Sequence, residues 1–203
     1  MLLSVASFAL SSITGTLHVC VGATTPLSDS STGGIWSSSN TSIATIVSST
    51  GVVTGVSAGV CTITYFLSGS TVTASFTVNP LPSPITGITH VCVGQTTTLS
   101  DTTSGGYWIS GSTSVATITS GGVVTGIASG TTVITYLLPG TYCTATTVVT
   151  VNPNPFAISG PSTVTTGGNI TLTDVTGGGV WSSSNTAIAT INRVNINSDF
   201  FEV

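Results

Sequence analysis

Charged side chains are almost absent from this sequence. Arg193 is the only Lys or Arg in 203 residues, and charged residues make up 3% of the chain, against about 25% in an average globular protein. A nucleic-acid-binding surface needs several cations to neutralise phosphates, so that class of protein is excluded. Paired carboxylates and any Ser/His/Asp or Cys/His arrangement are also missing. We therefore expect no catalytic residue, no cofactor and no metal site.

Long apolar runs are missing too. No run reaches the roughly 18 residues that a membrane-spanning helix needs, although 40% of the residues are hydrophobic. The apolar residues alternate with Thr and Ser, and Val, Ile and Thr favour strands over helices. Intrinsic disorder requires low hydrophobicity together with high net charge, so this composition excludes it. The sequence predicts an all-β protein.

One stretch occurs three times and organises the whole chain. It begins at a tryptophan and reads Trp-Ser-Ser-Ser-Asn-Thr-Ser-Ile-Ala-Thr-Ile at 36–46, with close variants at 108–118 and 181–191. Trp36, Trp108 and Trp181 stand 72 and 73 residues apart. Such a fixed period indicates a tandem array. Because Trp is the largest apolar side chain, we expect these three residues to mark the core of each repeat.

The period divides the chain as follows. Residues 13–80 form repeat 1, 81–84 a Pro-rich linker, 85–153 repeat 2, 154–157 a second linker, and 158–203 an incomplete repeat 3. Proline fixes φ and extends the residue before it, so the linkers should be short and stiff. Residues 1–12 have two interpretations, a degenerate signal peptide or the remnant of a preceding repeat.

Each full repeat contains about seven short alternating segments with a turn signal every 8–12 residues, the pattern of a small antiparallel β-sandwich. Repeat 3 follows this pattern to Ile191 and then departs from it. The last two strands of a sandwich are therefore expected to be absent. The tail is too short and too far from the pattern to replace them, and Phe200 and Phe201 are expected to cover at most one edge. We expect either that the chain is a fragment of a longer protein or that its end comes from a premature or shifted reading frame, with residues 158–203 incomplete as a folding unit.

The repeated motifs resemble a known family. The tryptophan stretch, Gly51-Val-Val-Thr-Gly-Val-Ser-Ala-Gly59 and Thr62-Ile-Thr-Tyr65 together are similar to the bacterial immunoglobulin-like (Ig-like) domain of group 2. Such domains occur as tandem modules in intimin- and invasin-like surface proteins, and the ending Val149-Thr-Val-Asn-Pro153 is similar to forms common in the Bacteroidetes. The resemblance implies tandem Ig-like sandwiches, an extracellular or cell-surface location and no enzymatic activity.

The four cysteines are disulfide candidates, and they allow three pairings. Cys92 and Cys143 lie in the first and last strands expected for repeat 2, which can run side by side in an Ig-like sandwich, so we predict a Cys92–Cys143 bridge. In repeat 1, Ser70 stands at the place of Cys143, and Cys20 is predicted to pair with Cys61 instead. Buried free thiols are the alternative, since a reduced cysteine packs as a small hydrophobic residue.

Two further residue types recur. His18 and His90 each precede a cysteine by two, but no additional ligand follows, so a strand-edge histidine is the simpler interpretation. Asp29, Asp101 and Asp174 follow the same strand of each repeat. A single carboxylate is too few for calcium, so we expect each to cap a turn by accepting a backbone N–H.

Repetition, stiff linkers and the lack of clustered chemistry predict a structural spacer in a secreted or surface-anchored bacterial repeat protein. The alternative is an adhesion module that binds glycan or a host protein through its loops. Exposed aromatic residues would favour adhesion, and Phe66 and Tyr107 are the candidates in the full repeats. The expected partners are neighbouring Ig-like repeats, a glycan or a surface protein, with neither nucleic acid nor a membrane span.

Overall fold

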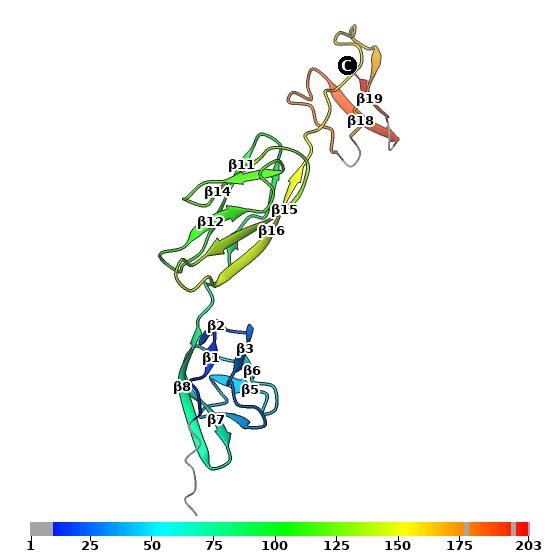
Figure 1. Cartoon of the computed structure of the whole chain (residues 1–203). Coiled ribbons are helices and arrows are strands. Elements are labelled where there is room, and N and C mark those ends of the chain that lie inside the picture. Colours follow the sequence, from blue (N-terminus) through cyan, green and yellow to red (C-terminus); the bar gives the residue numbers. More distant parts are fainter. Residues whose placement is uncertain (1–9, 177–178, 196–197, 203) are drawn as a thin grey trace, which may run out of the picture. The chain divides into compact units, whose positions relative to one another are not determined.

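The computed structural model describes residues 10–176, 179–195 and 198–202, with side chains described as far as Ile191. Most of the segment interpreted as a degenerate signal or repeat remnant, residues 1–9, lies outside that part. Every regular element in the described residues is a β-strand (Figure 1). The chain divides into two compact units, Met1–Val151 and Asn152–Val203. The first unit holds repeats 1 and 2.

Repeat 1 is built from two four-stranded sheets. One has the strand order β1-β3-β6-β5 and the other β2-β8-β7-β4. The strands are β1 (Thr14–Gly15), β2 (His18–Cys20), β3 (Thr24–Ser28), β4 (Ile35–Ser38), β5 (Ala44–Ile46), β6 (Val52–Gly55), β7 (Gly59–Leu67) and β8 (Ser70–Asn79). The ladders are antiparallel except that between β2 and β8, which is parallel. This is the Ig-like sandwich that the sequence predicts.

Repeat 2 has the same two sheets, with the orders β9-β11-β14-β13 and β10-β16-β15-β12. Its strands are β9 (Thr86–Gly87), β10 (His90–Cys92), β11 (Thr96–Ser100), β12 (Tyr107–Ser110), β13 (Ala116–Ile118), β14 (Val123–Gly126), β15 (Gly130–Leu137) and β16 (Thr144–Asn152). The last strand begins one residue later than the alternation suggests. Cys143 consequently lies in the β15–β16 loop and not in the strand.

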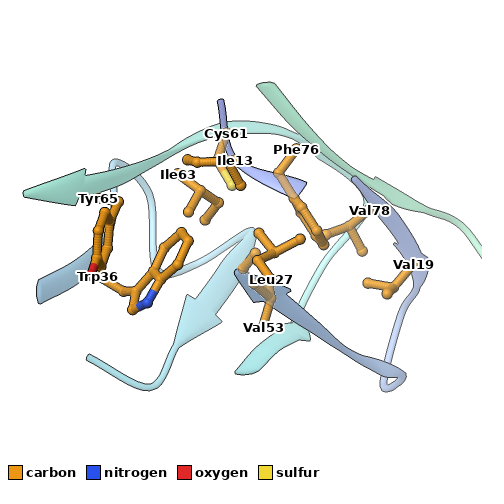
Figure 2. Close-up of a cluster of buried hydrophobic side chains, with 11 residues drawn as sticks. Ile13, Val19, Leu27, Trp36, Val53, Cys61, Ile63, Tyr65, Phe76 and Val78 are labelled. Carbon is orange, nitrogen blue, oxygen red and sulfur yellow. The ribbon is translucent and has the colours of Figure 1, made fainter. Parts of the chain in front are cut away.

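The core of repeat 1 comes from the inward residues of both sheets (Figure 2). Trp36 on β4 is 6% exposed, and its ring centroid lies 4.5 Å from that of Tyr65 on β7. Cys61, Ile63 and Tyr65 alternate along β7 and are all buried. Period-2 alternation thus sends one face of the strand into the sandwich.

Repeat 2 repeats this packing around a slightly more open tryptophan. Trp108 takes the position of Trp36 and lies 4.8 Å from the ring of Tyr136. Its indole is only partly buried, and it packs against a buried cluster that includes Leu99, Ile134 and Val149. The tryptophan therefore covers one side of this core instead of filling its centre.

The second unit contains one three-stranded sheet, β17-β19-β18. Its strands are β17 (Asn169–Leu172), β18 (Thr190–Asn195) and β19 (Ser198–Glu202). The expectation that the off-pattern tail covers at most an edge is wrong, because β19 pairs with both other strands. Ile170 pairs with Phe201, as Thr25 pairs with Val53 in repeat 1. The tail thus takes the place of β6.

Two other segments of repeat 3 remain irregular. Residues 163–165 and Trp181 correspond to β2 and β4, yet neither belongs to a strand, and Trp181 is only partly buried. In repeat 1 these strands pair with β8 and β7 respectively. No counterpart of β7 or β8 is found among the described residues after Val151. A segment without a hydrogen-bonding neighbour has no reason to extend into a strand.

Candidate functional site: the junction between repeats 1 and 2

The residues that could bear chemistry do not converge. No group of three or more His, Cys, Asp and Glu side chains able to hold a metal ion occurs in the described part of the chain. His18 and His90 are exposed on the short strands β2 and β10. The polar and sulfur groups gather instead at the ends of the sandwiches, around the linker between the two full repeats.

Each repeated aspartate caps a turn at the end where the chain enters its own repeat, and for Asp101 this end is the junction between repeats 1 and 2. Asp101 Oδ1 accepts a 2.7 Å hydrogen bond from the backbone N–H of Thr103. Asp29 accepts one from Ser31 at 2.8 Å, and Asp174 one from Thr176 at 2.6 Å. This is an Asx turn, in which the carboxylate replaces a backbone acceptor. Oδ2 of Asp29 and of Asp101 is buried and has no hydrogen-bond partner.

In each of the two full repeats, a tyrosine fixes the loop that the aspartate opens. The Tyr136 hydroxyl donates a 2.6 Å hydrogen bond to the carbonyl of Thr103 and accepts one of 3.0 Å from the N–H of Gly106. Tyr65 makes the same two bonds in repeat 1. A Cβ at Gly106 would lie 2.4 Å from the Tyr136 ring, so only glycine allows this approach.

The same loop holds the linker that enters the repeat. Thr103 Oγ1 accepts a 2.8 Å hydrogen bond from the backbone N–H of Ser83, which lies within the Pro-rich linker. Thr102 also donates to Ser83 Oγ at 2.8 Å. In the second unit, Thr176 Oγ1 accepts from the N–H of Phe156 at 2.9 Å. Asp101 and Asp174 therefore each position a threonine hydroxyl that anchors the chain just before its own repeat.

A disulfide joins the two full repeats. It links Cys20, the last residue of β2 in repeat 1, to Cys143 in the β15–β16 loop of repeat 2, with Cα atoms 5.7 Å apart. That loop encloses six residues, 138–143, between the paired Leu137 and Thr144. The matching loop of repeat 1 is a two-residue turn, Ser68–Gly69, with positive φ at both positions. Repeat 2 therefore has a longer hairpin, and this hairpin carries the bridging cysteine.

The predicted Cys92–Cys143 bridge is wrong because the two residues lie at opposite ends of β16. Strand β10 runs beside the C-terminal part of β16, where the N–H of Thr150 donates to the carbonyl of Thr89. Cys143 precedes the other end of that strand, seven residues from Thr150. At about 3.3 Å per residue the separation is on the order of 20 Å, whereas a disulfide needs Cα atoms within about 7 Å.

The predicted Cys20–Cys61 bridge is wrong because a strand lies between its two members. In the order β2-β8-β7-β4, β8 separates the strands of Cys20 and Cys61. Two strand spacings amount to about 9–10 Å, and the residues also differ in register along β8, where Cys20 pairs with Asn79 and Cys61 with Phe76. Cys61 is a buried free thiol and Cys92 a partly buried one.

One sequence signal did point to the observed bridge. His-Val-Cys-Val-Gly occurs in both repeats, but only repeat 2 has a cysteine in its last hairpin, where repeat 1 has Ser70. A cysteine that has no partner in its own repeat can form a disulfide with a cysteine of the neighbouring repeat. Sequence reasoning confined to single repeats missed this pairing.

Comparison with known proteins adds the family. The family model for the bacterial Ig-like domain, group 2, matches residues 12–78. Repeat 1 is a bacterial Ig-like domain of group 2. Repeat 2 shares the strand order of this Ig-like domain and its Trp–Tyr pair. The predicted resemblance is confirmed.

A curated relative aligns with most of the chain. The chain is 30% identical over 192 residues to ice-binding protein 1 of Shewanella frigidimarina (strain NCIMB 400). The alignment covers 81% of this chain but 21% of that protein, so the chain spans about a fifth of its length.

Two solved structures are similar to this chain at low sequence identity. A C-terminal fragment of intimin, in complex with the intimin-binding domain of the translocated intimin receptor, is 17% identical, with 75% of this chain and 67% of that chain covered and a TM-score of 0.47. Domains 4 and 5 of the S-layer protein SbsC are 18% identical, with 71% and 98% covered and a TM-score of 0.34. In the described part of the chain, no helix has the length and hydropathy needed to cross a membrane.

Proposed function

We propose that this chain is a non-catalytic spacer of a secreted or cell-surface bacterial repeat protein. In this role it holds successive Ig-like domains at a fixed separation. The observation that carries the proposal is the covalent bridge from Cys20 to Cys143, which ties repeat 1 directly to repeat 2. A binding domain does not need such a tie, whereas a spacer gains stiffness from it.

The junction has three connections instead of one. The linker contains Pro82 and Pro84 and directly follows Pro80, and these prolines restrict the backbone there. Ser83 in its middle is hydrogen-bonded to Thr102 and Thr103. The disulfide then adds a second covalent path between the repeats. Three separate restraints reduce the bending freedom that a single linker would leave.

The bridge also supports the proposed location. Structural disulfides persist in oxidising compartments such as the cell exterior, and are rare in the bacterial cytosol. An uncharged, Thr- and Ser-rich surface carries few groups that would attract oppositely charged molecules. We assign no ice binding to this chain, because the part aligned with the Shewanella protein is a fifth of that protein, and a supporting role accounts for its features.

Residual dipolar couplings measured on the full chain test the spacer role. With the bridge intact, amides of repeats 1 and 2 should fit one common alignment tensor, because the two domains then move together. Cys143→Ser should separate the data into two tensors, while the matched variant Cys92→Ser should leave them unchanged. Two independent tensors in the oxidised unaltered chain would refute a fixed spacing.

An adhesion role is the second candidate, and Tyr142 favours it. This side chain is 74% exposed in the β15–β16 loop, beside Cys143, and its φ is 59°. Exposed aromatic rings on loops are common binding residues. Phe66 and Tyr107 are also about half exposed, but both lie within strands. Binding to a glycan or surface-protein array that Tyr142→Ala abolishes and Tyr107→Ala preserves would support adhesion.

A further inference from the structure

Cys92 has the same surroundings in repeat 2 as the bridging Cys20 has in repeat 1. Each ends a three-residue strand, and each carbonyl accepts a 3.0 Å hydrogen bond from the residue three positions on, Ala23 or Gln95. Gly22 and Gly94 occupy the third position of these turns with φ of 80° and 81°. Both cysteines are partly buried. The backbone therefore presents the two sulfur atoms in the same way.

The chain leaves both repeats by equivalent linkers. Five residues lie between Asn79 and Ile85 after repeat 1, and five lie between Asn152 and Ile158 after repeat 2. The equivalent linker residues Ser83 and Phe156 donate their backbone N–H to equivalent threonines. A domain that follows repeat 2 is thus tethered with the same length of chain, and its entry is anchored in the same way.

Cys61, the other free cysteine, has different surroundings. It shows that a free thiol in this chain need not be an attachment point. Cys61 is 5% exposed within the sandwich, and its sulfur lies 3.7 Å from Ser38 Oγ. It packs as a small hydrophobic side chain. Cys92 alone is a free thiol at a position where the other repeat makes a bridge.

We propose that Cys92 is the attachment point for a cysteine in the last hairpin of a succeeding Ig-like repeat. The partner fits if its hairpin is extended and carries a cysteine as the 138–143 loop does. The domain that follows repeat 2 in this chain, residues 158–203, contains no cysteine, so no partner for Cys92 lies within these 203 residues. The inference extends the junction beyond the proposed spacer role, and it holds for a spacer and for an adhesin alike.

The bond forms by thiol–disulfide exchange with a disulfide oxidant such as oxidised glutathione. The Cys92 thiolate attacks the oxidant, which gives a Cys92–glutathione disulfide and one glutathione thiolate. The hairpin thiolate then attacks the Cys92 sulfur and releases the second glutathione. The two protein thiols lose two protons and two electrons, and the oxidant is reduced to two thiols.

An added repeat tests the inference. A second copy of residues 85–157, in which Cys92 is replaced by Ser, is inserted between Ala157 and Ile158 of the full chain, which is then oxidised with glutathione, alkylated and mapped by mass spectrometry. We expect Cys92 linked to the inserted copy of Cys143, with Cys20–Cys143 retained. In the matched control, Cys143→Ser in the inserted copy only, Cys92 should be fully alkylated. Full alkylation of Cys92 without that substitution, or its linkage to another molecule, would overturn the inference.

A measurement on the unaltered chain decides the matter if the longer protein does not fold. Under native conditions N-ethylmaleimide should label Cys92, and should leave Cys61 unlabelled until the protein is denatured, since only an accessible thiolate reacts. A Cys92 that resists labelling as Cys61 does would be unavailable to any partner, and would overturn the inference. The labelling of Cys92 does not depend on whether repeats 1 and 2 move together. Failure of this inference can therefore be distinguished from failure of the spacer proposal.

Discussion

The Tyr136 hydroxyl lies 2.6 Å from the carbonyl oxygen of Thr103, the residue whose side chain anchors the linker. Removing that hydroxyl in Tyr136→Phe leaves the Thr103 carbonyl and the Gly106 N–H without their partner. We expect repeat 2 to lose about 1–3 kcal/mol of unfolding free energy, the usual cost of an unsatisfied polar group. Urea denaturation measures the loss. Tyr107→Phe, at an exposed hydroxyl-bearing ring, is the control and should change little.

The tight approach of Gly106 to Tyr136 gives a second prediction. In Gly106→Ala the new Cβ would lie 2.4 Å from the ring, so the tyrosine must move and its hydrogen bonds must lengthen. We expect destabilisation of about 1–3 kcal/mol, as for other overpacked sites. Gly121→Ala is the matched control, because the nearest atom to its Cβ is 3.9 Å away. Equal melting temperatures for the two variants would contradict this account.

The two tryptophans should differ in what they contribute. Trp36→Ala should cost about 3–5 kcal/mol, the range for deletion of a buried aromatic side chain. Trp108 is less buried, so Trp108→Ala should lie below that range. Chemical denaturation followed by the fluorescence of the remaining tryptophans can compare them, with Tyr142→Ala as a surface control. A larger loss of unfolding free energy for Trp108→Ala than for Trp36→Ala would mean that burial does not determine how much each tryptophan stabilises its repeat.

The bridge should shield most of two domains from a stretching force. A force applied to the chain ends passes from Cys20 to Cys143 through the disulfide, bypassing the 123-residue separation between them. Those residues would contribute about 40 nm of contour length if extended. Force spectroscopy should therefore show about 40 nm more extension after reduction or in Cys143→Ser. Cys92→Ser should behave like the oxidised protein, and an unchanged extension on reduction would rule the shielding out.

The second unit should be less stable than the first. Its single three-stranded sheet lacks a described second sheet to pack against, and such a sheet is marginal in water. Hydrogen exchange should thus be faster in β17 than in the central strands β7 and β15. Exchange in a proven monomer that is equally slow in all three would show that residues 158–203 fold as firmly as the full repeats.

Local features of this protein followed from its sequence because their causes are local. Alternation along residues 59–67 predicts which side chains of β7 face the core, since neighbouring residues of a strand point to opposite faces. The position of Asp101 before a Gly-rich turn predicts a carboxylate that caps backbone N–H groups. The tryptophan period locates the repeats. None of these inferences needs knowledge of a distant contact.

The cysteine pairing and the fate of the C-terminal tail were decided only by the tertiary structure. Cys92 and Cys143 share a repeat, but strand direction places them at opposite ends of β16, while Cys20 meets the hairpin of the next domain. In the tail, β19 pairs with both β17 and β18 through backbone groups, and an amino-acid pattern does not record which strands exchange such hydrogen bonds. Both outcomes depend on which strand ends and edges meet in space. The sequence specifies the strands, but the packing of the whole fold determines which strand ends and edges lie side by side.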